Sequence, residues 1–305
     1  MIIITAKVHQ YLIDTLLQKG YEVMYEPLIT YAELLSKLDK ATGLVVTTRV
    51  KIDKAVIDKA PNLKWIGRLG SGLELIDIDY ATQHNILCVS TPEGNRNAVA
   101  EHVLGMLLGL MNNIYQACDE VKKGIWLRNE NRGVELSNKT VGIVGFGNTG
   151  RAFSKLLASF DVTLLAYDKY QSGFGGKLVR EVNLDQLCKY ADVISFHVPL
   201  TAETEYMADE QFFKALRQKP YIINASRGHI VQTEALIKAL ETKQIKGAAL
   251  DVMENEDLNS LTAEQSAQFN YLTSRKDVLI TPHIAGYSQE AFYKMSKTLL
   301  EKLNI

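Results

Sequence analysis

The feature that most constrains the fold is a glycine-rich segment near the middle of the chain. Gly145, Gly147 and Gly150 form a GxGxxG pattern, directly after an apolar strand-like run at residues 140–144 and before a helix-like run at residues 151–160. The three glycines permit a tight turn, a close approach of the backbone to a pyrophosphate and close packing of the helix on the strand. We therefore expect a doubly wound, parallel α/β sheet that binds a dinucleotide.

The acid that should follow such a turn is also present. The next strand-like run, residues 162–167, ends in Asp168, 18 residues after Gly150. A carboxylate at this position can accept hydrogen bonds from both ribose hydroxyls of the adenosine, and it would repel a 2′-phosphate. The pattern therefore favours NAD over NADP, although Lys169 beside the acid reduces that preference. A glycine-rich turn without a ligand is the alternative interpretation.

The size and charge of the chain exclude several classes of protein. Its 305 residues suffice for two domains, each with a core. A net charge of −1 gives no indication of binding to nucleic acid or to an anionic membrane. The most apolar stretch, residues 99–111, is interrupted by Glu101 and His102 and is too short to span a bilayer.

The N-terminus and the cysteines indicate a cellular compartment. The chain begins without the basic start and long apolar run of a signal peptide. Cys88, Cys118 and Cys188 are far apart and form no CxxC, so we predict buried free thiols in a reducing compartment and no metal site. These features predict a soluble, cytoplasmic protein.

The order of strand-like and helix-like runs predicts two domains. Strand-like runs alternate with helix-like runs over the first ninety residues, which predicts a parallel sheet covered on both faces. The expected strands are residues 1–4, 22–25, 43–46, 64–66 and 86–89, and the expected helices are residues 9–18, 31–38, 54–59 and 78–84. A turn at residues 91–95 and a long helix over residues 97–122 follow. A second series begins with the glycine-rich strand and continues at 193–197, 221–224, 247–251 and 278–281.

Because the nucleotide-binding series begins in mid-chain, we expect it to be inserted into the first domain. Residues 1–97 and 284–305 would form a flavodoxin-like, substrate-binding domain, to which a terminal helix over residues 289–303 returns. Residues 98–283 would form a Rossmann NAD-binding domain. We expect a ligand site between the two domains. Residues 254–273 are predicted to be an irregular surface segment.

Three side chains near expected strand ends suit hydride transfer to a 2-keto acid. The reaction needs a cation for the carboxylate and carbonyl, a proton donor and a group that keeps the donor charged. Arg227, His283 and Glu256 could supply these functions, because ligands bind at the carboxyl edge of such sheets. A surface salt bridge, a turn cap and a solvated acidic loop are the respective alternatives. Spacing alone does not choose between Glu254 and Glu256.

Several segments together resemble the D-2-hydroxyacid dehydrogenase family over nearly all of the chain. The matching segments are residues 67–72 (GRLGSG), 98–102 (AVAEH), 144–150 (VGFGNTG), 197–201 (HVPLT), 224–228 (NASRG), 249–256 (ALDVMENE) and 281–286 (TPHIAG). The resemblance implies two doubly wound domains, with a Rossmann domain inserted into a flavodoxin-like one. It also implies a homodimer that packs around the helix near residue 98.

The resemblance assigns roles position by position. Arg227 would bind the substrate, His283 would be the acid/base, and Glu256 would favour its protonated form. The backbone of Ser71 and Gly72 would receive the substrate carboxylate, and Asp251 would contact the nicotinamide carboxamide. The further positions that it implies for the cofactor NAD are Gly145, Gly147, Asn148, Thr149, Gly150, Asp168, His197, Val198, Pro199, Thr204, Ala225, Ser226 and Gly286.

The substrate is expected to be a small 2-hydroxy or 2-keto acid. The segments are most similar to those of family members that oxidise 3-phospho-D-glycerate to 3-phosphohydroxypyruvate for serine biosynthesis. A phosphate would need cations, and Arg49, Arg68 and Arg128 are the candidates, with solvated surface as the alternative. Glycerate, glyoxylate or lactate as substrate is the first rival, and a non-catalytic NAD-sensing interaction protein is the second.

The chain departs from the family pattern in ways that weaken parts of this assignment. Thr47 stands where the family often has an arginine, and Glu74 replaces a more common aspartate. Asp257 stands where a proline usually follows the acid that pairs with the histidine, which makes the position of Glu256 the least certain of the three. The chain ends at Ile305 without the extra regulatory domain of some relatives, so feedback control by serine is not expected.

Overall fold

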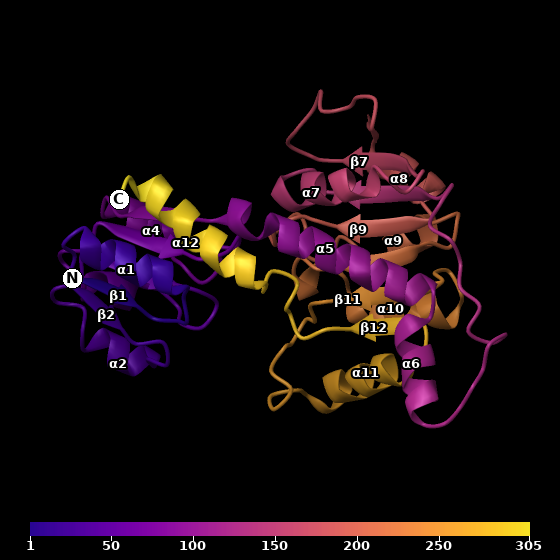
Figure 1. Cartoon of the computed structure of the whole chain (residues 1–305), viewed down its shortest axis with the longest axis horizontal. Helices are drawn as coiled ribbons and strands as arrows, with labels where there is room; N and C mark the ends of the chain where they lie inside the picture. The colour runs from indigo at the N-terminus through magenta and orange to yellow at the C-terminus, as the bar shows by residue number, and fades with distance from the viewer. The chain divides into compact units, whose positions relative to one another are not determined.

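The computed structural model describes all 305 residues, and the chain divides into two compact units (Figure 1). The first unit comprises Met1–Ala98 and Gly286–Ile305, and the second comprises Val99–Ala285. The sequence predicts boundaries after residues 97 and 283, and the structure divides after residues 98 and 285.

The first unit contains a five-stranded parallel sheet in the order β2-β1-β3-β4-β5. Its central strands are short apolar runs that are buried along their whole length, as in a sheet covered on both faces. The strands are β1 (Ile2–Ile4), β2 (Val23–Tyr25), β3 (Gly43–Val46), β4 (Trp65–Arg68) and β5 (Leu87–Ser90).

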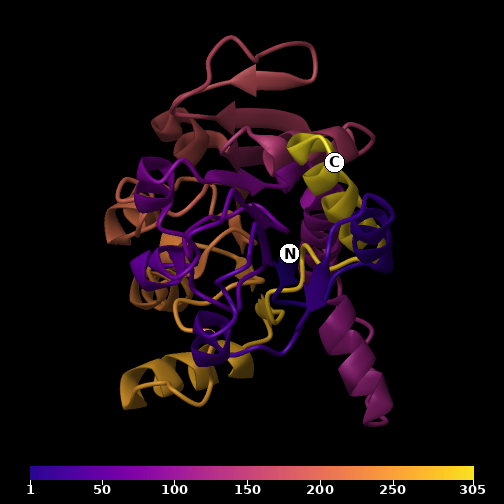
Figure 2. The ribbon, with the colours of Figure 1, turned by 90° about the vertical axis from the view of Figure 1, so that its left-hand side faces the viewer.

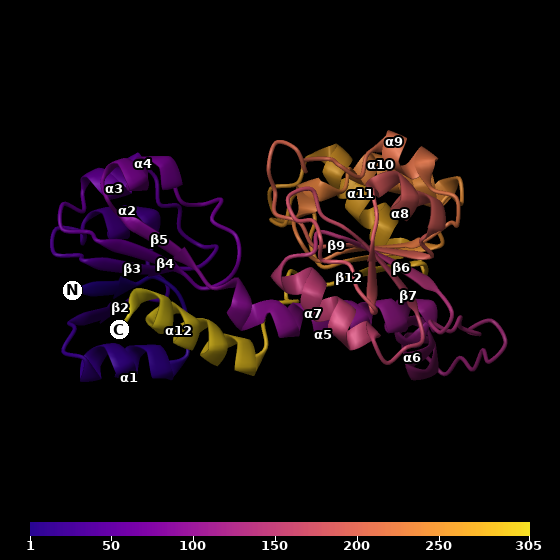
Figure 3. The same ribbon diagram turned by 90° about the horizontal axis from the view of Figure 1, so that it is seen from above.

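Helices cover both faces of this sheet (Figures 2 and 3). Apolar side chains of α2 (Tyr31–Leu35), α3 (Lys54–Asp58) and α4 (Ile78–Gln83) form one core with the sheet. On the other face, α1 (Gln10–Gln18) and α12 (Gln289–Leu303) lie side by side and form the second core. The C-terminal helix therefore returns to the first unit.

The second unit contains a seven-stranded parallel sheet in the order β12-β11-β10-β9-β6-β7-β8. The first strand of this sheet along the chain is the central strand β6. The strands β7 and β8 follow on one side of it, and β9 to β12 then follow on the other side. This order is the Rossmann arrangement, which places its ligand site where the winding direction reverses, between β6 and β9. The strands are β6 (Thr140–Val144), β7 (Thr163–Tyr167), β8 (Val179–Glu181), β9 (Val193–Phe196), β10 (Tyr221–Asn224), β11 (Gly247–Leu250) and β12 (Val278–Ile280).

Two apolar cores lie on the two faces of this sheet. One contains side chains of α5 (Pro92–Met111) and α7 (Asn148–Leu157). The other contains side chains of α8 (Leu184–Tyr190), α9 (Glu210–Ala215), α10 (Thr233–Glu241) and α11 (Ala263–Ser274). Figure 3 shows these two helical layers above and below the strands of the second unit.

The structure corrects the expected turn at residues 91–95 and the single helix over residues 97–122. The helix α5 already begins at Pro92, where a missing N–H costs nothing because the first amides of a helix have no partner in the helix. It ends at Met111, because Asn113 takes a left-handed conformation with φ = 52°, and a separate helix α6 (Ile114–Lys122) follows.

Two further expectations are wrong. The segment 254–273 is not irregular throughout, since α11 starts with a capping box in which Thr262 and Gln265 satisfy each other's backbone amides. Cys118 is exposed rather than buried, whereas Cys188 is buried and Cys88 is half-buried, and all three are free thiols.

No helix has the length and apolar character needed to cross a membrane. No cluster of three or more histidine, cysteine or acidic residues could hold a metal ion.

Candidate active site and coenzyme site

The glycine turn after β6 has room for a ligand at one of its three glycines. A side chain at Gly145, where φ is +91°, would lie 2.5 Å from the carbonyl oxygen of His197, and one at Gly150 would lie 2.1 Å from the carbonyl oxygen of Gly145. Nothing lies within 4 Å of the corresponding position at Gly147. The fold itself therefore requires Gly145 and Gly150, whereas Gly147 leaves the turn open.

The helix that follows the turn can bind an anion. It begins at Asn148, and its N-cap Gly147 provides no side-chain acceptor for the first backbone amides. Uncapped amides and the positive end of the helix dipole favour a phosphate at this position. Asn148 and Thr149 lie in this first turn and are half-buried. The turn and the helix therefore fit the pyrophosphate of a dinucleotide.

Asp168 connects the glycine turn to the loop after β7. Its carboxylate accepts hydrogen bonds from the backbone N–H of Phe146 at 2.8 Å, and of Tyr170 and Gln171 at 3.0 Å each. The side chain lies immediately after β7 and remains partly accessible. An acid in this place is suited to a ribose, because its carboxylate oxygens can accept hydrogen bonds from the ribose hydroxyls.

His197 lies beneath the glycine turn as a buried, neutral side chain. Its ring nitrogens lie 2.9 Å from Ser195 Oγ and 3.2 Å from Thr149 Oγ1, and burial lowers the pKa of His197 to about 3. The ring therefore supports the first turn of α7 rather than offering a charge to a ligand. The adjacent Val198 side chain lies close to Gly145.

Internal hydrogen bonds fix the loops after β9 and β10. Thr204 Oγ1 donates to the carbonyl of Pro199 at 2.6 Å, which closes the turn that follows β9. Ser226 Oγ donates to the carbonyl of Phe196 at 2.6 Å and thereby ties the loop after β10 to the end of β9. Pro199 is exposed and Ala225 is half-buried.

Asp251, directly after β11, organises the loop that carries His283. Its buried carboxylate accepts hydrogen bonds from Thr281 Oγ1 at 2.6 Å and from the backbone N–H groups of Ile284 and Ala285 at 2.9 and 2.8 Å. Burial alone would raise the pKa of Asp251, but hydrogen bonds from His102, Thr281, Ala285 and Ile284 together lower it. The charged carboxylate therefore fixes this loop, and its side chain is closed to solvent.

His102 is a part of this arrangement that the sequence did not reveal as a site residue. Its Nε2 lies 3.0 Å from Thr281 Oγ1 and 3.5 Å from Asp251 Oδ1. Because the Thr281 hydroxyl donates to Asp251, Nε2 of His102 is the donor to both. The position of His102 in the AVAEH segment was visible in the sequence, but no spacing pattern could connect it with residues about 150 to 180 positions away.

His283 and Glu256, two of the three predicted catalytic side chains, contact each other. His283 Nδ1 lies 2.8 Å from Glu256 Oε2, and both side chains are partly accessible to solvent. The backbone of His283 is left-handed, with φ = 55°, and its N–H donates to the carbonyl of Asp251 at 2.7 Å. Such a conformation is uncommon for a non-glycine residue and tends to occur at functional sites.

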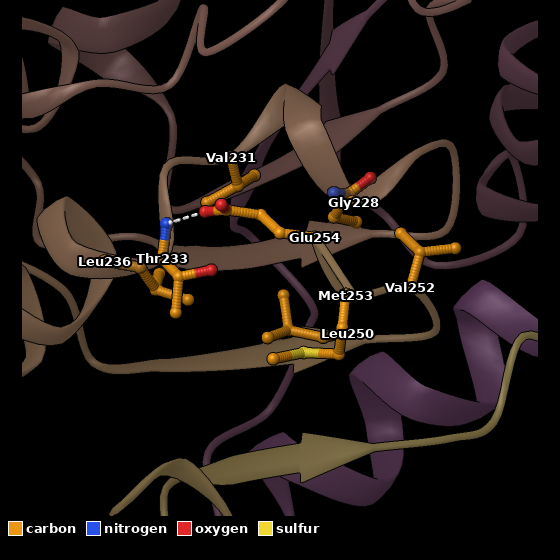
Figure 4. A pocket seen from close by; sticks show the side chains of 9 residues that line it. Gly228, Val231, Thr233, Leu236, Leu250, Val252, Met253 and Glu254 are labelled. Atoms are coloured by element: carbon orange, nitrogen blue, oxygen red, sulfur yellow. Dashed lines mark hydrogen bonds between the residues drawn. The ribbon is translucent and has the colours of Figure 1, made fainter. Parts of the chain in front are cut away.

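The neighbouring acid, Glu254, has a different position. Its carboxylate accepts the backbone N–H of Thr233, the first residue of α10, at 2.7 Å and the hydroxyl of Tyr206 at 3.0 Å. Figure 4 shows Glu254 directed at Thr233 across a small pocket that Gly228 and Met253 also line. The structure thus separates the two acids that spacing could not distinguish: Glu254 caps a helix and Glu256 contacts the histidine.

Arg227 lies in the loop after β10, next to the loop that carries Glu256. Its guanidinium donates to the carbonyl of Ser226 at 2.6 Å, and its own carbonyl accepts the side-chain amide of Asn224 at 2.8 Å. A side chain at Gly228 would lie 1.9 Å from the carbonyl oxygen of Met253, so the two loops are in close contact. Arg227, Glu256 and His283 therefore follow three adjacent strands, β10, β11 and β12.

The predicted substrate residues of the first unit lie near the ends of β3 and β4. Arg49 is exposed and donates to the backbone carbonyls of Thr5 and Pro27. Arg68 donates to the carbonyl of Leu69 at 2.8 Å, and Ser71 Oγ lies 3.4 Å from Asn95 Oδ1. A side chain at Gly286 would lie 2.9 Å from Asn95 Nδ2, and Gly72 is half-buried.

Comparisons with known proteins place the chain in a family. The family model of the D-isomer specific 2-hydroxyacid dehydrogenase NAD-binding domain matches residues 104–285. The chain is 35% identical to the D-3-phosphoglycerate dehydrogenase of Methanocaldococcus jannaschii over 295 residues, which cover 95% of this chain and 54% of that protein. It is 37% identical to the glyoxylate reductase of Thermofilum pendens over 278 residues, which cover 89% of this chain and 80% of that protein. The chain thus spans about half the length of the phosphoglycerate dehydrogenases it matches.

Solved structures show the same fold. The D-lactate dehydrogenase of Aquifex aeolicus, determined with NAD and lactic acid, has a TM-score of 0.86 at 26% identity, with 100% of this chain and 94% of that chain covered. An acyclic imino acid reductase in complex with NADPH and D-Arg also has a TM-score of 0.86, at 25% identity, with 100% and 96% covered. The second unit is accordingly an NAD-binding domain, and the chain belongs to the D-isomer specific 2-hydroxyacid dehydrogenase family.

Proposed function

We propose that this protein is an NAD-dependent dehydrogenase that oxidises 3-phospho-D-glycerate to 3-phosphohydroxypyruvate, and so serves serine biosynthesis in the cytoplasm. The observation that carries the catalytic part of the proposal is the 2.8 Å contact between His283 Nδ1 and Glu256 Oε2 beside the carboxyl edge of the NAD-binding sheet. The substrate is supported by relatives named D-3-phosphoglycerate dehydrogenase, which are 32–35% identical over 95–99% of this chain.

In this proposal His283 is the acid/base. Because Glu256 engages Nδ1, Nε2 is the nitrogen available to the substrate. Nε2 would accept the hydroxyl proton during oxidation, and the carboxylate of Glu256 would stabilise the imidazolium that results. Bound NAD supplies the chemistry of accepting the hydride from C2. In the reverse direction the imidazolium returns its proton to the carbonyl oxygen.

Arg227 would hold the substrate carboxylate and polarise the carbonyl. A guanidinium is planar and can donate two parallel hydrogen bonds, which suits a carboxylate better than an ammonium does. The loop between Asn224 and Gly228 is fixed at its base by Asn224 and Ser226, so the arginine would be presented from a rigid support. We further propose that Ser71 and Gly72 bind the carboxylate through their backbone, and that Arg49, Arg68 and Arg128 attract the phosphate.

The coenzyme would be bound by the glycine turn and the loops beside it. Asn148 and Thr149 would contact the pyrophosphate, Asp168 the adenosine ribose, and the segment 197–204 the adenosine half. Ala225, Ser226, Asp251 and Gly286 would lie toward the nicotinamide half. The open position at Gly147 and the uncapped start of α7 support this placement.

A dehydrogenase or reductase of an unphosphorylated 2-hydroxy acid is the second candidate. The glyoxylate reductase relative favours it, because the match covers more of that protein than of the phosphoglycerate dehydrogenases. Arg49 and Arg68 also already donate to backbone carbonyls of the first unit, so neither has all its donors free for a phosphate.

One assay separates the two candidates. We would follow oxidation of NADH and of NADPH with phosphohydroxypyruvate, hydroxypyruvate, glyoxylate and pyruvate, and compare kcat/KM. The proposal predicts that phosphohydroxypyruvate with NADH gives the highest value. A clear preference for an unphosphorylated acid would favour the second candidate. NADH binding without turnover of any of these acids would instead favour an NAD-sensing protein.

We also propose that the protein forms a homodimer. The helix α6 buries none of its side chains, and Trp126 in the loop that follows is 81% exposed. Other exposed apolar residues of this segment are Ile114, Tyr115, Val121 and Ile125. A group of exposed apolar side chains at one place commonly marks a protein interface. Analytical ultracentrifugation should give twice the chain mass for the wild type and a smaller mass for Trp126→Asp, and a wild-type monomer would contradict the proposal.

A further inference from the structure

A salt bridge joins the two loops on either side of the glycine turn. Lys169, one residue after Asp168, has its Nζ 2.6 Å from Oε1 of Glu203. The hydroxyl of Tyr170 donates to the other oxygen of the same carboxylate. Lys169 follows β7 and Glu203 lies in the turn after β9, and β6 lies between these strands in the sheet. The pair therefore links the loops that flank the end of β6, where the glycine turn begins.

The charge of Lys169 matters because of its place in the sequence. A cation immediately after the ribose-binding acid is positioned to attract the 2′-phosphate of NADP, and thus works against Asp168. The contact with Glu203 raises the pKa of Lys169 and lowers the pKa of Glu203, so both groups are charged at neutral pH. The charges of Lys169 and Glu203 then cancel, and the net charge of Asp168, Lys169 and Glu203 stays negative.

A second cation near Asp168 is engaged differently. Arg151 lies with its guanidinium carbon 4.7 Å from the centre of the Phe146 ring and donates to the side-chain amide oxygen of Gln171 at 2.8 Å. Gln171 in turn donates from its side chain to Asp168 at 3.3 Å. Arg151 forms no salt bridge with a carboxylate. The pairing with an acid thus distinguishes Lys169 from the other basic residue of this region.

We propose that Glu203 determines coenzyme specificity by pairing with the charge of Lys169 and so weakening its attraction for a 2′-phosphate, which strengthens the preference for NAD over NADP. This inference rests on the proposed placement of Asp168 at the adenosine ribose. Glu203 is a positioning residue here, because it acts through Lys169. The side chains of Lys169 and Glu203 are 53% and 48% exposed, so the pair adds little to the stability of the fold and can be removed without unfolding the protein.

The test compares dissociation constants for NADH and NADPH, measured by fluorescence titration of the full-length protein. Glu203→Gln is expected to tighten NADPH binding relative to NADH by about threefold to tenfold at low salt, and the gain should shrink at high salt. Glu205→Gln is the matched control, because Glu205 is exposed in the same turn and its loss changes the net charge equally. In a Lys169→Gln background, Glu203→Gln should give a markedly smaller change.

The outcomes separate this inference from the proposed function. If Glu203→Gln leaves the ratio of the dissociation constants for NADH and NADPH unchanged, the inference is overturned. The proposed function is unaffected by that result as long as the protein binds NADH. The inference would also be overturned if Glu205→Gln changed this ratio as much as Glu203→Gln does, or if Glu203→Gln changed it fully in the Lys169→Gln background. The effect would then be one of overall charge. Failure of the wild type to bind either nucleotide would contradict the proposed function itself, and with it this inference.

Discussion

The two units have the same kind of sheet but hold their polar side chains in different ways. In the second unit, side chains from successive loops contact one another: Glu256 contacts His283, and Asp251 receives the hydroxyl of Thr281. In the first unit, Arg49 and Arg68 donate to backbone carbonyls of that unit. His283 and Glu256 of the second unit are therefore already in contact with each other. Arg227 of that unit, like Arg49 and Arg68 of the first, would have to exchange a hydrogen bond to a backbone carbonyl for one to a ligand. We expect chemistry to depend on the second unit and substrate preference on the first.

The strongest test of this contrast is removal of the imidazole of His283. We expect His283→Ala to lower kcat by about 10²–10⁴-fold, the usual contribution of a positioned acid/base. NADH binding should stay close to that of the wild type, because His283 contacts Glu256 and not the glycine turn. Steady-state kinetics and NADH titration check both parts, with exposed His84→Ala as the control. Wild-type turnover in His283→Ala would remove this residue from the mechanism.

An arginine from each unit gives the next comparison. Arg227→Lys should lower kcat/KM by roughly tenfold to a hundredfold, because one ammonium does not reproduce two parallel hydrogen bonds to a carboxylate. Arg49→Lys should have a smaller effect, since Nη1 alone of this guanidinium contacts the carbonyls of Thr5 and Pro27, and one ammonium can replace one nitrogen. The measurement is kcat/KM with the preferred acid. Equal losses in the two variants would contradict the contrast between the units.

Two glycines of the same turn separate coenzyme binding from folding. Gly147→Ala should weaken NADH binding about tenfold with little change in stability, because a Cβ there meets nothing within 4 Å in the free protein. Gly150→Ala should lower the free energy of unfolding by about 1–3 kcal/mol, because its Cβ would lie 2.1 Å from the carbonyl oxygen of Gly145. Thermal unfolding and NADH titration of both variants are needed. A destabilised Gly147→Ala that binds NADH normally would show that the turn is structural only.

A test that involves no ligand concerns the pH dependence of stability. His197 is buried with its pKa lowered to about 3, so it is neutral in the folded protein, whereas in the unfolded chain it binds a proton below about pH 6.5. The contribution of neutral His197 to the free energy of unfolding is complete above pH 6.5. It is lost as the pH falls from there toward 3, at up to about 1.4 kcal/mol per pH unit. Urea unfolding of His197→Asn should show a shallower loss of stability over this range. Identical pH slopes for the two proteins would contradict this assignment.

Much of the fold could be predicted because it depends on local patterns. The glycine turn, the apolar strands and the terminal helix each carry a period or spacing that a single segment displays. One missed feature depends on a single residue, since Asn113 breaks a helix by taking a left-handed conformation. The start of α11 was also missed, although its capping box of Thr262 and Gln265 is a local pattern that the sequence displays.

The site could be predicted less completely than the fold. The choice of Glu256 over Glu254 came from family resemblance, and only the structure shows that Glu254 instead caps α10. The contacts of His102 with Thr281 and of Lys169 with Glu203 join residues 179 and 34 positions apart. No local pattern contains such pairs, since the sheet topology brings them together.

The most direct test is a crystal structure of the protein with NADH and a non-reactive analogue of the 2-keto acid. Our account predicts that His283 Nε2 lies within hydrogen-bond reach of the analogue's carbonyl oxygen, about 2.6–3.2 Å, with Nδ1 still on Glu256. It also predicts that the Arg227 guanidinium contacts the analogue's carboxylate. An analogue bound beside the nicotinamide with neither side chain in reach would contradict the account.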